Sequence, residues 1–480
     1  MVSWQAVASG DASYDLVLSA SENIDFHQIH AHTVVLPHGL GFNKYVPDSN
    51  GPGTRLAGLP PEWVLRAGRA TVLLSHPEQR DQLLAASPAS AGHTAVVGDT
   101  ELDRIQASQT LRARYRCELG TGERTLVTLA STWRRDSLLG RWRTLPLQLL
   151  GELPADLYQV CLALHPNIWS FYGEHQISLW LSAALDAGLV LIPPESGWQA
   201  ALIAADQVIA DHGSLGLMAA ALDKPLLMNP ASAETVPESP PDSLVRAAPS
   251  LVMDLPLREQ LDHARATHRP GQFTSITSRV FAHTGAAAAN LRSLVYAKLG
   301  LAAQSPGPSL RRIPVPTPTR RPVTSHVVLT VTAEAEELAI IRFPASAWRN
   351  EYVADTHVVA GESEADVRLL ERAAAITCDR PLTPPESRHW ALSMLAANPG
   401  ARVAVGGFPG DYTAIVRKVG LVRIEMSGSH PDGVSLAAST VYCCWLSGCL
   451  RDRVLTVRSG SNLVEASLTV TPAEAGHGEP

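Results

Sequence analysis

The chain has 480 residues, more than one hydrophobic core usually organises, so we expect two or three domains. Its 45% hydrophobic and 18% charged residues are typical of a globular protein and exclude a disordered one. The 39 basic and 46 acidic side chains give a net charge of −7, which disfavours a nucleic-acid partner.

Targeting and redox signals point to a cytoplasmic protein. The first twenty residues lack a basic segment followed by an unbroken apolar run, which argues against secretion. The least polar stretch, Val434–Leu450, is short and contains serines and a threonine, so it predicts a buried helix and no integral membrane segment. The six cysteines include no C-x-x-C pair, and Cys443, Cys444 and Cys449 are expected to be small core residues.

The first 300 residues alternate short apolar runs with longer helical stretches, the pattern of a parallel sheet covered on both faces. We predict an N-terminal Rossmann-like unit over residues 1–118, whose expected strands are Asp15–Leu18, Thr33–Leu36, Thr71–Leu74 and Thr94–Val97. Since one strand precedes Thr33, either this sheet is trimmed or sequence upstream is missing.

A second Rossmann-like unit is predicted over residues 119–303, with the two units meeting at a ligand-binding cleft. Helices are expected at Ile177–Ala187, Ser214–Leu222 and about 285–301. The expected strands are Thr125–Leu129, Gln159–Leu164, Leu189–Ile192, Gln207–Ala210 and Pro225–Met228.

The last third of the chain has a different composition. Residues 304–324 are rich in proline and arginine and predict an extended linker. Residues 325–472 predict a smaller α+β domain, which could contact a protein partner, and residues 473–480 predict a disordered tail. The expected elements of the domain are strands near 327–331, 338–343, 402–405 and 421–426, with helices near 365–375 and 387–397.

A histidine with two glycines and a lysine follows the second predicted strand. His38 comes directly after Thr33–Leu36, at the sheet edge where open α/β folds bind ligands. Its imidazole could accept a hydroxyl proton near pH 7, while Gly39 and Gly41 permit close backbone approach and Lys44 could reach a phosphate. The alternative is a turn histidine that is hydrogen-bonded only to backbone.

Two further polar turns follow strands of the second unit. His165 and Asn167 flank Pro166 after Gln159–Leu164 and could donate hydrogen bonds into the cleft, or simply end the strand. Ser131 and Thr132 follow the first strand of this unit and could offer hydroxyls to a phosphate, although the same letters also make an ordinary helix cap.

The most specific element runs from Ala204 to Met228, where a buried strand ends at Asp211 and a small-residue helix begins near Ser214. The free amides of such a helix start suit a diphosphate, which would lie against Asp211, His212, Gly213 and Ser214. Alternatively, Ser214 serves only as the helix N-cap.

Other sequence motifs give weaker support for a function. His27, His30 and His32 have a spacing that suggests a metal, but no nearby carboxylate or cysteine completes a site, so neither a metal nor a cofactor is expected. The chain has no G-x-S-x-G and no G-x-x-x-x-G-K-[ST] motif, which removes the usual anchors of hydrolase and P-loop functions.

The combination of a strand followed by His38-Gly39, a strand followed by His165-Pro166, and Asp211-x-x-Ser214 leading to Lys224-Pro225 resembles the CDP-glycerol glycerophosphotransferase family. The chain looks like an actinobacterial relative of this GT-B group, and more distantly like the nucleotide-sugar 2-epimerases. The resemblance covers residues 10–300 and does not extend to the domain after Ser325.

The resemblance implies a transferase that takes a nucleotide-diphosphate-linked donor and a hydroxyl acceptor. His38 would be the base, His165 would contact the donor diphosphate, and Gly213 and Ser214 would hold the nucleotide phosphates. In the family, an aromatic residue and a serine stand where this chain has His212 and Gly213, so the donor stays open.

Two alternatives to a transferase remain. A non-catalytic protein could keep the cleft as a ligand sensor, as the altered turn and the late start suggest. An epimerase would need carboxylates in the cleft, for which Asp99 and Glu195 are the candidates.

Overall fold

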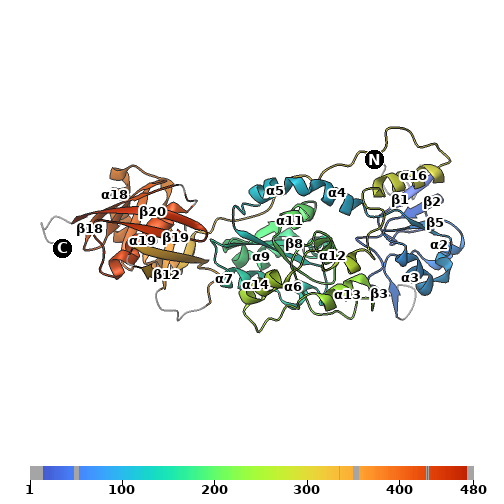
Figure 1. Cartoon of the computed structure of the whole chain (residues 1–480), viewed down its shortest axis with the longest axis horizontal. Coiled ribbons are helices and arrows are strands. Elements are labelled where there is room, and N and C mark those ends of the chain that lie inside the picture. The colour runs from blue at the N-terminus through green and yellow to red at the C-terminus, as the bar shows by residue number, and fades with distance from the viewer. Residues whose placement is uncertain are drawn as a thin grey trace.

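The computed structural model describes residues 14–47, 53–334, 336–349, 356–428, 430 and 432–472, so the predicted tail at 473–480 lies outside the described residues. Figure 1 shows three bodies in a row, with the first α/β unit at one end, the second in the middle and a β-barrel at the other end. Within the described ranges, every helix is too short or too polar to span a bilayer.

The first unit is a four-stranded parallel sheet in the order β1-β2-β5-β6. Every residue of β5 is buried, as its unbroken apolar run predicts for a sheet covered on both faces. The strands are β1 (Leu16–Ser19), β2 (His32–Val35), β5 (Ala70–Leu74) and β6 (Thr94–Val96). The helices and short 3-10 turns are α2 (Glu62–Arg66), α3 (Glu78–Ala86), η1 (Pro88–Ser90), α4 (Thr100–Ser108), η2 (Gln109–Leu111) and α5 (Arg112–Glu118).

A late helix returns to this first sheet. In α16 (Ala287–Lys298), Leu291 and Leu294 pack against Val34 and Leu73, and Figure 1 shows α16 beside β1 and β2. The buried carboxylate of Asp103 accepts the amide of Ala287 and so fixes where the helix begins. The chain therefore returns from the second unit to the first at α16.

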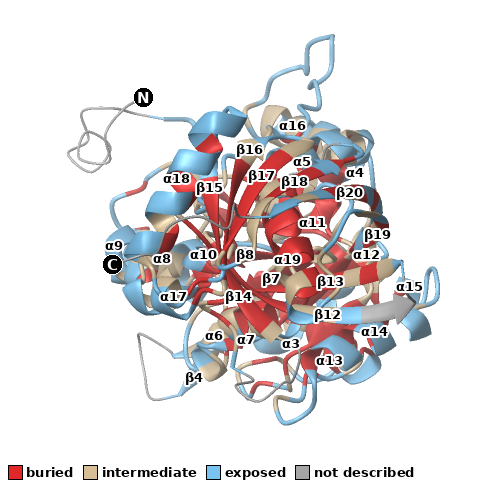
Figure 2. Ribbon diagram, turned by 90° about the vertical axis from the view of Figure 1, so that its left-hand side faces the viewer, coloured by how far each residue is buried: buried red, intermediate tan, exposed pale blue. Residues whose placement is uncertain are grey.

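The second unit is a five-stranded parallel sheet in the order β11-β10-β7-β8-β9, with a separate apolar cluster on each face. Figure 2 shows β7, β8 and α11 buried, whereas α9 is largely exposed. The strands are β7 (Thr125–Ser131), β8 (Tyr158–Leu164), β9 (Val190–Ile192), β10 (Gln207–Ala210) and β11 (Leu226–Met228). All five lie within a few residues of their predicted positions.

The helices of the second unit cover both faces of its sheet. The helix predicted at Ile177–Ala187 is two helices that meet at Leu181. The full set is α6 (Leu138–Arg141), α7 (Leu145–Glu152), α8 (Pro166–Tyr172), α9 (Glu174–Trp180), α10 (Ser182–Asp186), α11 (Trp198–Ala204), α12 (Ser214–Ala221), α13 (Pro240–Ala247), α14 (Leu257–Thr267) and α15 (Thr274–Thr277).

The proline- and arginine-rich linker lacks helix and strand, but it is docked along α4, α5 and the edge of the second sheet. Ile313 is 2% exposed, its amide donates to Ser108 Oγ at 2.8 Å, and Tyr115 Oη donates to its carbonyl at 2.7 Å. Further on, Thr319 pairs with Leu191 at the edge strand β9. The linker therefore fixes the path of the chain toward the C-terminal domain.

The C-terminal domain is a closed nine-stranded barrel in the order β12-β13-β19-β20-β18-β17-β16-β15-β14. The predicted helix at Val434–Leu450 is confirmed as α19 (Gly433–Leu446), which is buried on every face and shares one core with the inward side chains of the strands. Helix α18 (Pro384–Ala397) packs on the other side of the wall, and α17 (Val367–Arg372) is peripheral.

The expected α+β description of this domain missed the closure into a barrel. Strand alternation predicts that one face is buried but not that the first and last strands of a sheet pair. The strands are β12 (Ser325–Glu334), β13 (Glu337–Pro344), β14 (Thr356–Gly361), β15 (Ala375–Pro381), β16 (Val403–Phe408), β17 (Asp411–Val416), β18 (Gly420–Met426), β19 (Arg453–Ser459) and β20 (Asn462–Pro472).

Candidate functional site

Two histidines from different units meet where the two sheets face each other. His38 follows β2, His165 follows β8, and their ring centroids lie 5.5 Å apart. Both residues stand just beyond the carboxyl ends of parallel strands, where α/β folds bind ligands. His38 is exposed and His165 is partly buried, so a ligand at this edge would touch both.

The tautomer of His165 is fixed by the helix that it caps. The amide of Asn167 donates to His165 Nδ1 at 3.1 Å, so the neutral ring carries its proton on Nε2. Burial, followed by the charges of His38 and Lys44, lowers the pKa of His165 to about 4. His165 is therefore a neutral hydrogen-bond donor at pH 7, suited to an anionic oxygen and unsuited to act as a base.

Asp211 is the anchor of the second-unit side. Its side chain is 2% exposed, and Oδ2 accepts the amides of Thr132 and Leu138 at 2.7 and 2.9 Å. Oδ2 also accepts the hydroxyl of Thr132, while Oδ1 accepts the amide of Gly213. Because protein donors already surround this carboxylate, its role in the structure is to hold the loop after β7 against the turn after β10, beside the start of α12.

The other polar residues of these loops are also used internally. Ser131 Oγ accepts the amide of Leu139 at 3.1 Å and donates to the carbonyl of Thr132. Gly213 is the N-cap of α12, and a Cβ there would collide with the methyl group of Thr132. A larger residue at this position would therefore displace Thr132.

The hydroxyl of Ser214 binds the first unit. The amide of Leu40 donates to Ser214 Oγ at 3.1 Å, and Gln79 Nε2 donates to the carbonyl of Leu40 at 2.8 Å. Ser214 does not cap its own helix, so the N-cap alternative is wrong. The amides of Ser214 and Leu215 at the start of α12 lie beside this contact, while that of Gly216 donates to the carbonyl of the N-cap Gly213.

Glycine conformation sets the path of the His38 turn. Gly39 and Gly41 both have left-handed backbones, with φ of +67° and +68°. A Cβ on Gly39 would lie 2.5 Å from Ser214 Oγ, and one on Gly41 would lie 2.6 Å from Pro37 Cβ. The two glycines that the sequence singled out are thus required by close packing.

Beyond this turn, the chain of the first unit pairs with the second unit. Lys44 forms an antiparallel bridge with Thr235, and the amide of Tyr45 donates to the carbonyl of Glu234 at 2.9 Å. The segment continues into a hairpin of β3 (Tyr45–Pro47) and β4 (Thr54–Leu56). Burial lowers the pKa of Lys44, and Asp211 and Glu234 oppose this effect.

His212 is buried with no partner. It is 3% exposed, and neither ring nitrogen has a hydrogen-bond partner within the described part of the chain. Burial lowers its pKa, and the charge of Lys44 acts in the same direction. The ring is therefore neutral at pH 7.

The remaining candidates lie in other settings. His32 contacts the carbonyl of Gly68 and the hydroxyl of Thr71, and among the described residues no group of three or more metal-binding side chains occurs. Burial raises the pKa of Asp99 to about 6, but its carboxylate caps α4 by accepting the amide of Leu102. Glu195 is exposed.

Sequence reasoning missed several residues of the site. Asn229 follows β11 and is buried, and Trp133 lies with its ring centroid 6.4 Å from that of His165. Arg134 has a left-handed backbone, stacks on Trp133 and pairs with Glu234. The position of Trp133 after a strand was a usable signal, whereas the loop that contains Glu234 carries no motif.

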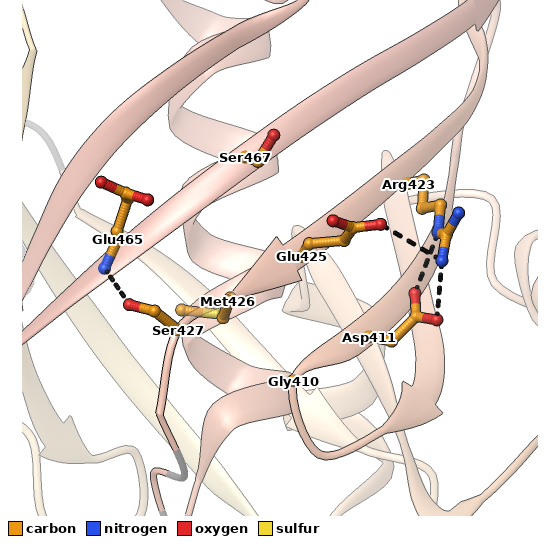
Figure 3. Close-up of a pocket in the computed structure, with 8 residues that line it drawn as sticks. All are labelled: Gly410, Asp411, Arg423, Glu425, Met426, Ser427, Glu465 and Ser467. Carbon is orange, nitrogen blue, oxygen red and sulfur yellow. Dashed lines mark hydrogen bonds and ion pairs between the residues drawn. The ribbon is translucent and has the colours of Figure 1, made fainter.

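Cavities lie beside the site and elsewhere. One of about 160 Å³ between the units is lined by residues that include Asn43, Gln79, Val236 and Arg279. Another, of about 440 Å³, lies on the outer wall of the barrel, where Figure 3 shows Arg423 paired with Asp411 and Glu425. Its lining carries the carboxylates of Asp411, Glu425 and Glu465 against the single cation of Arg423, so this cavity is acidic overall.

Comparisons with known proteins give distant structural likenesses. No family model matches the chain, and no curated protein matches it. Among solved structures, the wall teichoic acid polymerase TagF is similar at 13% identity over 56% of this chain and 69% of that chain, with a TM-score of 0.41.

Two further solved structures are similar at the same level. Anabaena HepE in complex with UDP and glucose matches at 12% identity over 62% of this chain and 81% of that chain, with a TM-score of 0.35. A glycosyltransferase from Rickettsia africae matches at 10% identity over 62% and 79%, with a TM-score of 0.34. Similarity at this level does not establish a shared activity.

Proposed function

We propose that the chain is a GT-B-type transferase that moves a sugar or glycerophosphate-like group from a nucleotide-diphosphate-linked donor to an acceptor hydroxyl. The observation that carries the proposal is the meeting of His38 with His165, from two units, beside Lys44 and the start of α12. These groups can supply a base, two donors to an anionic leaving group and the positive end of a helix.

The different roles of His38 and His165 follow from the protonation state of His165. His165 is neutral with its proton on Nε2, so it donates to a phosphate oxygen and leaves proton removal to His38. His38 takes the proton of the acceptor hydroxyl, and the acceptor oxygen bonds to the carbon or phosphorus of the transferred group. The bond to the nucleotide phosphate breaks, and its electron pair stays on the phosphate oxygen.

The leaving phosphate would be stabilised at the second-unit side. Lys44 lies close enough to His165 to lower its pKa, so a phosphate between them would receive an ionic contact and a hydrogen bond. Partial burial strengthens both interactions relative to water. Asp211 does not touch the ligand in this scheme, because its oxygens hold the loop after β7 against the start of α12.

The test is transfer activity of His38→Ala. We expect turnover to fall by about 10²- to 10⁴-fold, the usual contribution of a general base, with nucleotide affinity within a few-fold of wild type. The matched control is His263→Ala, an exposed histidine of α14 outside the site, which should keep full activity. Transfer that is unchanged in His38→Ala would remove His38 as the base.

A non-catalytic ligand-binding protein is the second candidate. It is favoured by the contact between Leu40 and Ser214, which places part of the first unit against the start of α12. If nucleotide-diphosphate compounds raise the melting temperature and no donor is consumed with any hydroxyl acceptor, this candidate replaces the transferase. An epimerase, which would convert a nucleotide sugar without an acceptor, is disfavoured because the carboxylate of Asp99 caps α4 and Glu195 is exposed.

A further inference from the structure

Three buried polar side chains beside the proposed site have atoms without hydrogen-bond partners within the described residues. They are His212, Asn229 and Thr235, which are 3%, 1% and 8% exposed. The unpartnered atoms are both ring nitrogens of His212, Oδ1 of Asn229 and Oγ1 of Thr235. Buried polar atoms in native proteins are nearly always paired, and a group bound beside these three side chains would supply the missing partners.

The three side chains belong to one neighbourhood. His212 follows β10 and Asn229 follows the adjacent strand β11, with the amide of Asn229 donating to the carbonyl of Ala210 at 2.8 Å. Asn229 Nδ2 donates to the carbonyl of Asp136, whose carboxylate acts on the pKa of His212.

Thr235, in the segment after β11 of the second unit, closes this neighbourhood on the side that faces the first unit. It forms the antiparallel bridge with Lys44, and Lys44 is near enough to His212 to lower its pKa. The amide of Val236 donates to the carbonyl of Asn43 at 3.0 Å and completes the pairing.

The hydrogen-bonding character of the cluster selects the chemistry of the occupant. Neutral His212 offers one donor and one acceptor, Thr235 offers both, and Asn229 Oδ1 is an acceptor only. A phosphate oxygen is an acceptor and would be repelled by the carbonyl oxygen of Asn229. A hydroxyl group both donates and accepts, so neighbouring hydroxyls of an uncharged polyol match the cluster.

We infer that His212, Asn229 and Thr235 bind the hydroxyl groups of a polyol moiety of the donor. The inference rests on the proposed function and deepens it, because it separates the polyol from the phosphates, which Lys44 and His165 would bind. The polyol is either the ribose of the nucleotide or the transferred sugar or glycerol, since these share the same chemistry.

The test compares ligands that differ in their hydroxyl groups. Calorimetry on the full chain measures binding of pyrophosphate, UDP, UDP-glucose and CDP-glycerol by wild type, His212→Phe and Thr235→Val. Each variant is expected to bind the recognised ligands about tenfold more weakly, the effect of one lost hydrogen bond, and pyrophosphate as wild type does. Weaker UDP binding identifies ribose, whereas an effect limited to UDP-glucose or CDP-glycerol identifies the transferred group.

The matched control is Thr121→Val. Thr121 is also buried with an unpartnered hydroxyl, but it precedes β7 and so lies at the opposite edge of the same sheet. Thr235→Val and Thr121→Val should have similar effects on stability, and only Thr235→Val should change ligand affinity. If neither His212→Phe nor Thr235→Val weakens any ligand, the cluster is structural and the inference is overturned.

The polyol site and the proposed transferase activity can be refuted independently of each other. Wild-type protein that binds the nucleotides without transfer refutes the transferase and leaves the cluster to be decided by the same variants. Should wild type bind no nucleotide, the histidine ring signals in NMR are followed as glucose or glycerol is added. A shift of the His212 signal that Thr235→Val abolishes supports the polyol site, and its absence overturns the site.

Discussion

The two sides of the candidate site are built on different principles. On the second-unit side, one buried carboxylate gathers the loops after β7 and β10, and the ring of His165 is held by a backbone amide. On the first-unit side, His38 is exposed on a turn whose path depends on two left-handed glycines. The second unit therefore holds His165 and the start of α12 in place through internal hydrogen bonds. The first unit instead presents His38 on an exposed turn whose path is set by close packing of its glycines.

The largest effect is expected from removal of the anchor on the second-unit side. Asp211→Ala leaves the amides of Thr132, Leu138 and Gly213 buried without their acceptor. We expect the free energy of unfolding to fall by about 3–5 kcal/mol, as for other buried charges that lose or leave their partners. Denaturant unfolding measures this loss.

An exposed aspartate provides the control for this substitution. Asp254 lies on the surface of the second unit, and Asp254→Ala should stay within about 0.5 kcal/mol of wild type. A cost for Asp211→Ala close to that of Asp254→Ala would show that the loops are held by something else, and the contrast between the two sides would disappear.

The sequence predicted the strands and missed the contacts that make the site. Each strand of the two sheets is a short apolar run, and burial on both faces leaves few other structures for such runs. The position of His38 and His165 after strands also followed from the sequence. Their approach to 5.5 Å depends on how the units pack, which no local pattern encodes.

The residues that the sequence assigned to phosphate binding show how far local sequence patterns can predict a site. Ser131, Thr132 and Asp211 are polar residues after strands, so the sequence assigned them to a ligand. In the structure the hydroxyl of Ser131 is engaged within the loop after β7, and the hydroxyl of Thr132 and the carboxylate of Asp211 join that loop to the turn after β10. Whether a polar group faces a ligand or a neighbouring loop depends on long-range pairing, and the same limit applies to the closure of the C-terminal barrel.

A smaller effect is expected on the first-unit side from Gly39→Ala. The substitution forces alanine into a left-handed backbone and places Cβ 2.5 Å from Ser214 Oγ. Rotation of the serine would relieve the collision but break the hydrogen bond from Leu40. We expect a loss of about 2–3 kcal/mol in the free energy of unfolding.

The control for Gly39→Ala isolates the contact from the backbone strain. Gly92 has a similar φ of +75°, and nothing lies within 4 Å of a Cβ built there. Gly92→Ala should therefore cost about 1 kcal/mol, the strain alone. Equal losses for the two glycine variants would mean that the turn adjusts at little energetic cost. The contact between Leu40 and Ser214 would then contribute little to stability.

The smallest effect on the free energy of unfolding is expected when the pH is lowered. The pKa of His165 falls from 6.5 unfolded to about 4 folded, so between these values the unfolded chain binds a proton that the folded chain excludes. Its contribution to stability is complete above pH 6.5 and is lost as the pH falls toward 4. By pH 5 we expect a loss of about 1 kcal/mol, after allowance for solvent screening of a partly exposed ring.

His165→Gln removes this proton-linked loss, so the variant should lose about 1 kcal/mol less unfolding free energy than wild type between pH 7 and 5, while the buried His326 and His357 still contribute to the slope. The exposed His263→Gln should lose as much as wild type. Denaturant unfolding at pH 7, 6 and 5 compares the three proteins. If His165→Gln and wild type lose stability in parallel, the ring of His165 is not held neutral by its surroundings. It could then share proton transfer with His38, and the division of labour between the two sides would have to be redrawn.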